Sequence, residues 1–147
     1  MKSLVTCIVV TLFLSFILPG TILAQSGILE GTWEVVSVKT TSPDGTIVYE
    51  RTVDDPDDKG GSIKILNSTH FAVVGHKMDG SFGWATAGTY TVEGTTYTEF
   101  VDKAADPDWV GWVNPAEFTL EGDILKTKRI VSNKNITEET WRRVKVE

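Results

Sequence analysis

The stretch GTYTVEGTTYTEFVD, residues 88–102, decides the fold class of this chain. It contains two runs rich in Thr, Tyr and Val, 88–93 and 95–102, on either side of the turn signal Glu93-Gly94. Two such runs around a short glycine turn are typical of a β-hairpin. The stretch therefore predicts two antiparallel strands.

The same pattern continues in both directions along the chain. Short stretches rich in β-branched and aromatic residues alternate with Gly, Asn and Asp turns, and hardly any stretch has a helical pattern. The other predicted strands are 33–39, 46–53, 62–66, 70–74, 116–120, 124–131 and 136–146. Their spacing favours an all-β domain, a single antiparallel up-and-down β-barrel or a sandwich, with a short helical turn in 26–31 before the first strand.

The first 24 residues differ from the rest of the chain. Lys2 precedes an uncharged apolar run, Leu4–Leu18, which is shorter than the roughly 20 residues that span a bilayer. Ala24 is a small residue suited to signal peptidase. We therefore expect a signal peptide over 1–24, a barrel domain over 25–147, a secreted or periplasmic location, and no stable membrane insertion after cleavage. A retained membrane anchor is the alternative.

Charge and cysteine content exclude several classes of function. The chain has a formal net charge of −6, and removal of the first 24 residues takes away one lysine and no acidic residue. An acidic domain is a poor ligand for nucleic acid, so we expect no nucleic-acid partner. Cys7 is the only cysteine and lies in the predicted signal peptide, so the mature domain has neither a disulfide nor a thiol nucleophile.

Both ends of the domain carry a recognisable pattern. Gly31-Thr32-Trp33 opens the first predicted strand and Trp141-Arg142-Arg143-Val144 closes the last. Together with residues 62–66, 69–74 and 88–99, these segments resemble the small bacterial lipocalin-like (calycin-type) families of exported proteins. The resemblance implies a β-barrel with a central cavity, no agreed ligand, and an arginine of the last strand beside the first-strand tryptophan.

An up-and-down barrel needs a plug at one end, and Trp33 is large enough to supply it. If Trp141 faces inward, the period of two places Arg143 inward as well and leaves Arg142 in solvent. We therefore expect Arg143 to stack on Trp33 at the barrel floor and to donate to backbone carbonyls there. Two surface arginines are the alternative.

Alternation on the other strands predicts a ligand site inside the barrel. An inward Glu99 needs a partner because an isolated buried charge is costly, and Arg129 is the candidate partner. A bulge that turns Glu99 outward is the alternative. Trp109 and Trp112 lie in the turn-rich stretch 106–112, and we expect them to cover the mouth. The predicted ligand-binding residues are Phe71, Trp84, Tyr90, Tyr97, Glu99, Phe118, Arg129, Trp109 and Trp112.

No catalytic or metal-binding pattern stands out in the sequence. His70 and His76 are six residues apart, and there is no H-x-H, H-E-x-x-H or G-x-S-x-G motif. The acidic run 54–58 lacks the glycine and the distal glutamate of a calcium loop. We therefore expect no catalytic residue, no metal and no cofactor, and a protein that is not an enzyme.

The sequence thus predicts an exported barrel that binds a small hydrophobic or amphipathic ligand in its central cavity. A packed barrel that serves as a cell-envelope interaction module is the alternative. A low-specificity enzyme on the same barrel is the third hypothesis. The oligomeric state and the identity of the ligand are left open.

Overall fold

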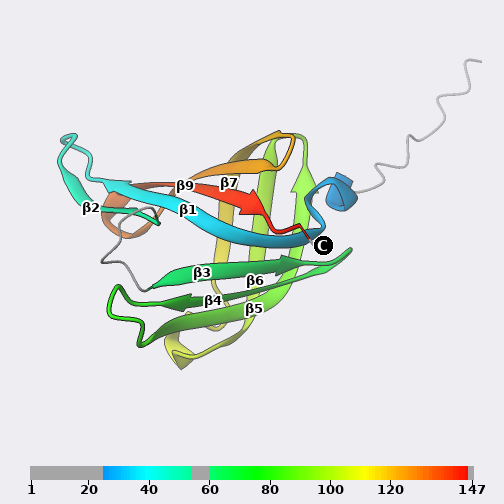
Figure 1. The fold of residues 1–147 in the computed structure, drawn as a ribbon, viewed down its shortest axis with the longest axis horizontal. Helices are drawn as coiled ribbons and strands as arrows, with labels where there is room; N and C mark the ends of the chain where they lie inside the picture. The colour runs from blue at the N-terminus through cyan, green and yellow to red at the C-terminus, as the bar shows by residue number, and fades with distance from the viewer. Residues whose placement is uncertain (1–24, 54–59, 146–147) are drawn as a thin grey trace, which may run out of the picture.

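The structure of the chain, a computed structural model, describes residues 25–53 and 60–145. Regular structure in these residues is almost entirely extended (Figure 1). The strands are β1 (Gly31–Thr41), β2 (Ile47–Thr52), β3 (Gly61–Leu66), β4 (His70–His76), β5 (Phe82–Glu93), β6 (Thr96–Ala104), β7 (Val113–Glu121), β8 (Ile124–Ile130) and β9 (Ile136–Arg143). The short 3-10 helices are η1 (Gln25–Leu29), η2 (Pro107–Trp109) and η3 (Ser132–Lys134).

The strands close into an antiparallel barrel. β1 pairs with β3 through Gly31–Glu34 on one side and with β9 along most of its length on the other. The circuit β1-β3-β4-β5-β6-β7-β8-β9 therefore has no free end among the described residues. β2 is an additional strand that pairs with the second half of β1, and Figure 1 shows this hairpin projecting beyond the barrel. The all-β barrel prediction is confirmed, and the sandwich alternative is wrong because β1 and β9 are hydrogen-bonded to each other.

Several strands are longer than the apolar pattern predicts. β5 begins at Phe82 and not at residue 88, because its small residues still pair with β4, as Ala85 does with Val74. β7 begins at Val113 and not at residue 116, whereas β9 ends at Arg143 and not at residue 146. The predicted signal peptide and the acidic run 54–58 lie outside the described residues.

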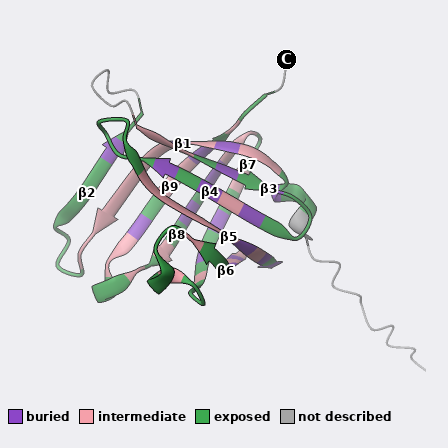
Figure 2. Ribbon diagram, turned by 90° about the horizontal axis from the view of Figure 1, so that it is seen from below, coloured by how far each residue is buried: buried purple, intermediate pink, exposed green. Residues whose placement is uncertain are grey.

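Burial alternates along the strands, as Figure 2 shows by the change between purple and green. The inward side chains form one core, with Trp33, Tyr97, Leu125 and Trp141 among its fully buried members. On β3 a charged side chain faces the interior and apolar side chains face solvent. The Lys64 side chain is 1% exposed, whereas both neighbouring isoleucines are exposed. The barrel interior is therefore not purely apolar.

The floor of the barrel is built around Trp33. Its indole Nε1 donates to the carbonyl of Leu29 in η1 at 2.9 Å, and the Arg143 guanidinium lies 4.1 Å from its ring centre. Arg143 also donates to the carbonyls of Glu30 and Ile28, which ties η1 across this end. Gly31 has φ of 139°, and a Cβ there would meet Arg143 Nη1 at 2.5 Å. The Gly-x-Trp pattern thus leaves room for the guanidinium on the indole.

Arg143 and Arg142 point in opposite directions, as the period of two predicts. Arg142 pairs with Glu34 on the outer wall at 2.7 Å, and its side chain is 57% exposed, compared with 26% for Arg143. No helix among residues 25–53 and 60–145 is long and apolar enough to cross a membrane.

Candidate functional site

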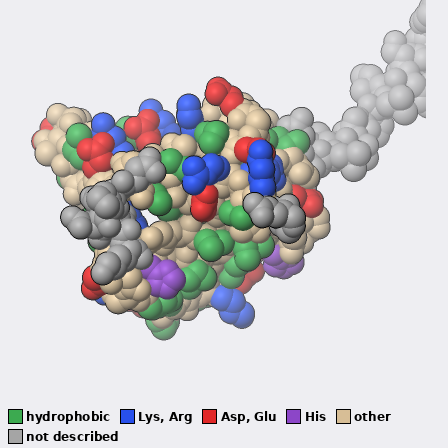
Figure 3. Space-filling model, in the orientation of Figure 1, with side chains coloured by type: hydrophobic (Ala, Val, Ile, Leu, Met, Phe, Trp, Pro, Cys, Tyr) green, Lys and Arg blue, Asp and Glu red, His purple; other side chains and the backbone are tan. Residues whose placement is uncertain are grey.

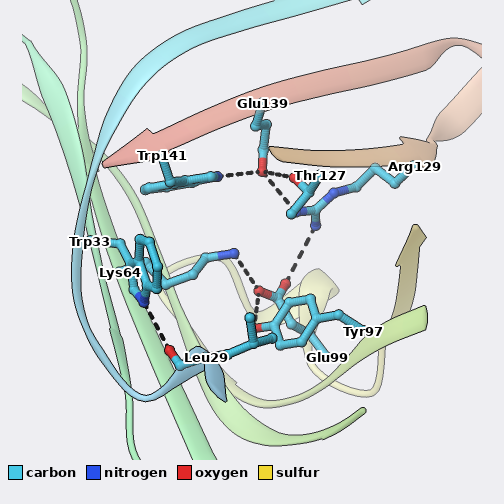
Figure 4. A network of polar contacts seen from close by, with 9 residues as sticks. All are labelled: Leu29, Trp33, Lys64, Tyr97, Glu99, Thr127, Arg129, Glu139 and Trp141. Carbon is cyan, nitrogen blue, oxygen red and sulfur yellow. Dashed lines mark hydrogen bonds and ion pairs between the residues drawn. The ribbon is translucent and has the colours of Figure 1, made fainter. Parts of the chain in front are cut away.

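A chain of buried polar contacts crosses the barrel interior (Figure 4). Lys64 Nζ on β3 lies 2.8 Å from Glu99 Oε1 on β6. The other carboxylate oxygen of Glu99 lies 3.4 Å from Arg129 Nη1 on β8, and Arg129 Nη2 lies 2.9 Å from Glu139 Oε2 on β9. Cations and anions therefore alternate along the chain, so each buried charge has an opposite charge beside it.

Neutral donors add hydrogen bonds to both carboxylates. The Tyr97 hydroxyl donates to Glu99 Oε1 at 2.8 Å. Thr127 Oγ1 and the indole Nε1 of Trp141 donate to Glu139 Oε2 at 3.0 and 3.1 Å. Because these donors come from different strands, closing the barrel is what brings the network together.

The network keeps its carboxylates ionised. Burial raises the pKa of Glu99, but Lys64 and Arg129 outweigh this effect and lower the pKa to about 2. Burial likewise opposes ionisation of Glu139, and Arg129 and Lys64 lower its pKa below the ordinary value. Burial and the neighbouring Glu99 raise the pKa of Tyr97 well above its ordinary value, so this hydroxyl stays a donor.

Two aromatic rings also stabilise the Lys64 ammonium. Its Nζ lies 4.8 Å from the ring centre of Trp141 and 5.2 Å from that of Tyr97. A cation over an aromatic face gains electrostatic attraction, and more so away from water. A lysine within the barrel is therefore held by one carboxylate and two rings.

A pocket of about 220 Å³ lies over this network. Four ionisable side chains, four indoles and three smaller residues line it. The ionisable ones are Lys64, Glu99, Arg129 and Glu139; the indoles are Trp84, Trp109, Trp112 and Trp141; the others are Val73, Thr86 and Asn114. The combination of aromatic walls with a few polar groups is typical of small-molecule sites.

The loop between β6 and β7 forms one wall of the pocket. Asp106 caps η2 by accepting from the backbone N–H of Asp108, and Val101 on β6 exchanges two backbone hydrogen bonds with Gly111 and Trp112. The rings of Trp109 and Trp112 are stacked with their centres 5.6 Å apart. The tryptophan pair is thus held at the mouth by hydrogen bonds to the barrel wall.

A glycine makes space for the opposite wall. Trp84 on β5 pairs with Gly75 on β4, and a Cβ on Gly75 would meet the indole Nε1 of Trp84 at 2.3 Å. The indole therefore lies against the backbone of β4.

One donor in the pocket lining has no partner among the described residues. The Arg129 Nε atom is buried and makes no hydrogen bond, although both terminal nitrogens of the guanidinium are bonded. A buried N–H without an acceptor is costly. Because this atom is buried from solvent, the unpaired N–H lies within the network and does not face the open part of the pocket.

The structure brings together five of the nine predicted ligand-binding residues. The pocket lining includes Trp84, Glu99, Trp109, Trp112 and Arg129, and Glu99 faces inward with only 4% of its surface exposed. Outward rotation of Glu99 by a bulge, the alternative considered above, does not occur.

The other four predicted residues are packed in the core and do not line this pocket. They are Phe71, Tyr90, Tyr97 and Phe118. Alternation along a strand tells which side chains face inward but not how deep each one lies along the barrel axis, so it did not separate these four residues from the pocket lining. Tyr97 still contributes indirectly through its hydroxyl on Glu99.

Sequence reasoning missed Lys64 and Glu139. Both had a usable signal: Glu139 lies two residues before the inward Trp141, and Lys64 lies two residues before Leu66, which is in the core. The exposed isoleucines on either side of Lys64 concealed its inward position, since apolar residues normally mark the buried face.

The two histidines are on the outer wall. β4 runs unbroken from His70 to His76, and both side chains are exposed. Within the described part of the chain, no group of three or more His, Cys, Asp or Glu residues has the arrangement to hold a metal ion.

A closed antiparallel barrel with a pocket over buried charges is the class that the fold and the site define. The family model described as "Domain of unknown function (DUF4488)" matches residues 28–147, so the chain belongs to that family. The comparison with curated proteins gives no match.

Among solved structures, the chain is similar to two engineered barrels. The first is a redesigned β-barrel with 17% identity and a TM-score of 0.49, over 82% of this chain and 95% of that one. The second is a de novo designed fluorescence-activating β-barrel with 13% identity and a TM-score of 0.47, over 84% of this chain and 100% of that one. These likenesses concern the fold alone.

Proposed function

We propose that this protein binds a small, partly apolar molecule in the interior pocket and is not an enzyme. The observation that carries the proposal is a pocket of about 220 Å³ whose lining combines four indoles with a few polar side chains. A cavity of roughly 150 Å³ holds benzene, so this pocket suits a single ring with a short polar substituent.

The contacts assign a role to each wall. The apolar part of the ligand lies against Trp84, Trp109 and Trp112, where each Å² of buried apolar surface contributes roughly 25 cal/mol. The polar part forms hydrogen bonds with the side-chain amide of Asn114. Glu99 has both oxygens engaged by protein donors, so it holds Lys64 and Arg129 in place.

The test is titration with 2-phenylacetamide, which has one ring and one amide. We expect saturable shifts in the NMR signals of the indole N–H groups of Trp84, Trp109 and Trp112. The Trp33 indole N–H is bonded to Leu29 at the floor and should not shift. Equal shifts at Trp33 and at the mouth, or no saturation, would contradict binding in this pocket.

A matched pair of variants separates pocket binding from surface adsorption. Trp112 is 49% exposed and lines the pocket, whereas Tyr49 is 43% exposed on β2 and does not. Trp112→Ala should weaken binding at least about fivefold, since it removes a ring from the wall, and Tyr49→Ala should leave it unchanged.

We also propose that the barrel acts outside the cytoplasm, in the periplasm or after secretion. The proposal is supported by the uncharged apolar run Leu4–Leu18 after Lys2. Intact-mass measurement of the exported protein should show Gln25 as its first residue. A membrane-bound product that keeps residues 1–24 would contradict this.

A cell-envelope interaction module is the second candidate, favoured by the outer wall. Ile63, Ile65 and Val74 are 51, 52 and 44% exposed on β3 and β4, and Figure 3 shows hydrophobic side chains gathered over these strands. Exposed apolar patches often mark protein contacts. If Ile65→Lys abolished recovery of a partner while phenylacetamide bound nowhere, this second function would replace the first.

A further inference from the structure

The charges that line the interior pocket cancel. Its ionisable side chains among the described residues are two cations, Lys64 and Arg129, and two anions, Glu99 and Glu139. Each anion lies within ion-pair distance of a cation: Lys64 is 2.8 Å from Glu99, and Arg129 is 2.9 Å from Glu139. The lowered pKa values of both carboxylates keep these two groups ionised at neutral pH.

This balance determines what a charged ligand would meet. A carboxylate in the pocket would approach two cations that already have partners and two anions that repel it. An ammonium would approach two anions that already have partners and two cations that repel it. Either ion would lose its hydration without gaining a free counter-charge, and burial of an uncompensated charge is costly. A neutral ligand avoids this cost.

The pocket nevertheless offers hydrogen bonds to a neutral polar group. Asn114 in the lining carries both N–H donors and an acceptor oxygen in its side-chain amide. A carbonyl or hydroxyl oxygen on a ring substituent accepts a hydrogen bond from this amide without adding charge.

We propose, on the basis of the binding function above, that the pocket selects uncharged one-ring ligands that carry a hydrogen-bond acceptor. The balance of Lys64 and Arg129 against Glu99 and Glu139 excludes carboxylates and amines of the same shape. These four residues are the specificity determinants of the site.

Three ligands of nearly equal size test the selection: 2-phenylacetamide, phenylacetate and protonated 2-phenylethylamine. The wild-type domain should bind the amide at least about tenfold more tightly than either ion. Equal binding of the amide and phenylacetate, with all binding weakened by Trp112→Ala, would overturn the charge selection and leave the binding function standing. Binding of none of the three, to the wild type or any variant, would refute the binding function itself.

Two variants change the pocket charge in opposite directions. Glu139→Gln keeps an acceptor for Thr127 and Trp141 and leaves one excess positive charge, so affinity for phenylacetate should rise at least about tenfold. Lys64→Met leaves one excess negative charge, so affinity for phenylethylamine should rise instead. If one variant fails to fold, the other still tests whether an excess charge in the pocket raises affinity for a ligand of the opposite charge.

Glu138→Gln is the matched control for Glu139→Gln. Glu138 is the neighbouring residue on β9, its side chain is 53% exposed, and it pairs with Lys128 on the outer wall. The control changes the net charge of the protein equally but leaves the pocket unaltered. Affinity for phenylacetate should stay at the wild-type value, and a rise equal to that of Glu139→Gln would overturn the proposal.

Discussion

At the scale of single residues, position in the pleat decides what a charged side chain does. Arg142 and Arg143 are adjacent in sequence, yet one pairs with Glu34 in solvent and the other stacks on Trp33. The difference arises because successive side chains of a strand point to opposite faces.

The two arginines should therefore contribute unequally to stability. Arg143→Ala removes a cation–π contact and two hydrogen bonds to backbone carbonyls, so we expect a loss of about 1–3 kcal/mol. Arg142→Ala removes an exposed ion pair worth about 0–1 kcal/mol. Chemical denaturation of both variants checks this, and equal midpoints would show that the floor contact is not stabilising.

Glu99 predicts the behaviour of the barrel in acid. Its pKa in the folded protein is about 2, below the ordinary value of 4.5, so its ionised form stabilises the fold above the unfolded pKa. That contribution is lost as pH falls through the window from about 4.5 to about 2. The pKa of Glu139 is also lowered, so this residue adds to the loss of stability as the pH falls.

Denaturation midpoints of the wild type and Glu99→Gln, measured from pH 6 to pH 2, check this. The wild type should lose stability steadily over the window, and the variant should start lower and fall less steeply. Asp44 and Asp79, whose pKa values are also lowered, remain in both proteins. They should therefore make the same contribution to the pH dependence of stability in each. Parallel curves would mean that Glu99 does not carry the acid sensitivity.

At the scale of elements, irregular positions shape the strands around the site. The β5–β6 register shifts between Ala87 and Gly88, and a Cβ on Gly88 would lie 1.9 Å from the carbonyl oxygen of Phe100. Bulges of this kind bend a strand and increase its twist. The extra residue here is Asp102 on β6, so β6 is the strand that bends, and Gly88 leaves room for its close approach to β5.

Gly88→Ala should destabilise the barrel by about 1–3 kcal/mol, because the clash is with backbone and the strands must separate to relieve it. Gly27→Ala is the control, since a Cβ there meets no atom closer than 3.9 Å. Thermal melting compares the two. A midpoint for Gly88→Ala equal to that of Gly27→Ala would contradict the close approach.

At the scale of the whole molecule, closure between β1 and β9 places a polar network where a small domain normally has only apolar side chains. The network draws on β3, β6, β8 and β9, so no single hairpin contains it. A half-satisfied buried network would be worse than an apolar core. Its nearly complete pairing makes the orphaned donor of Arg129 the exception.

Closure also predicts a gradient of local stability. β4 is paired on both sides, whereas β2 pairs with β1 alone among the described residues and is mostly exposed. Amide hydrogens of β2 should therefore exchange faster than those of β4, since fewer contacts must open. Hydrogen exchange followed by NMR measures this, and equal protection would show that β2 opens only with the barrel.

From the sequence alone, the existence of most strands and the facing of their side chains could be derived. Turn residues and a period of two are local properties of the chain, so Glu99 could be placed inward and Arg143 could be distinguished from Arg142. The ends of the strands could be predicted only where the composition changes from β-branched and aromatic residues to turn residues. The small residues at the start of β5 fit neither group, so they were not assigned to the strand.

The tertiary structure alone decided which inward side chains meet. Lys64 lies beside Glu99 because β3 and β6 face each other across the barrel, and Tyr90 lies in the core while Trp84 on the same strand reaches the pocket. Depth along the axis and distance across the interior depend on the register and shear of all the paired strands. These quantities are set by contacts between residues far apart in sequence, and alternation within one strand carries no information about them.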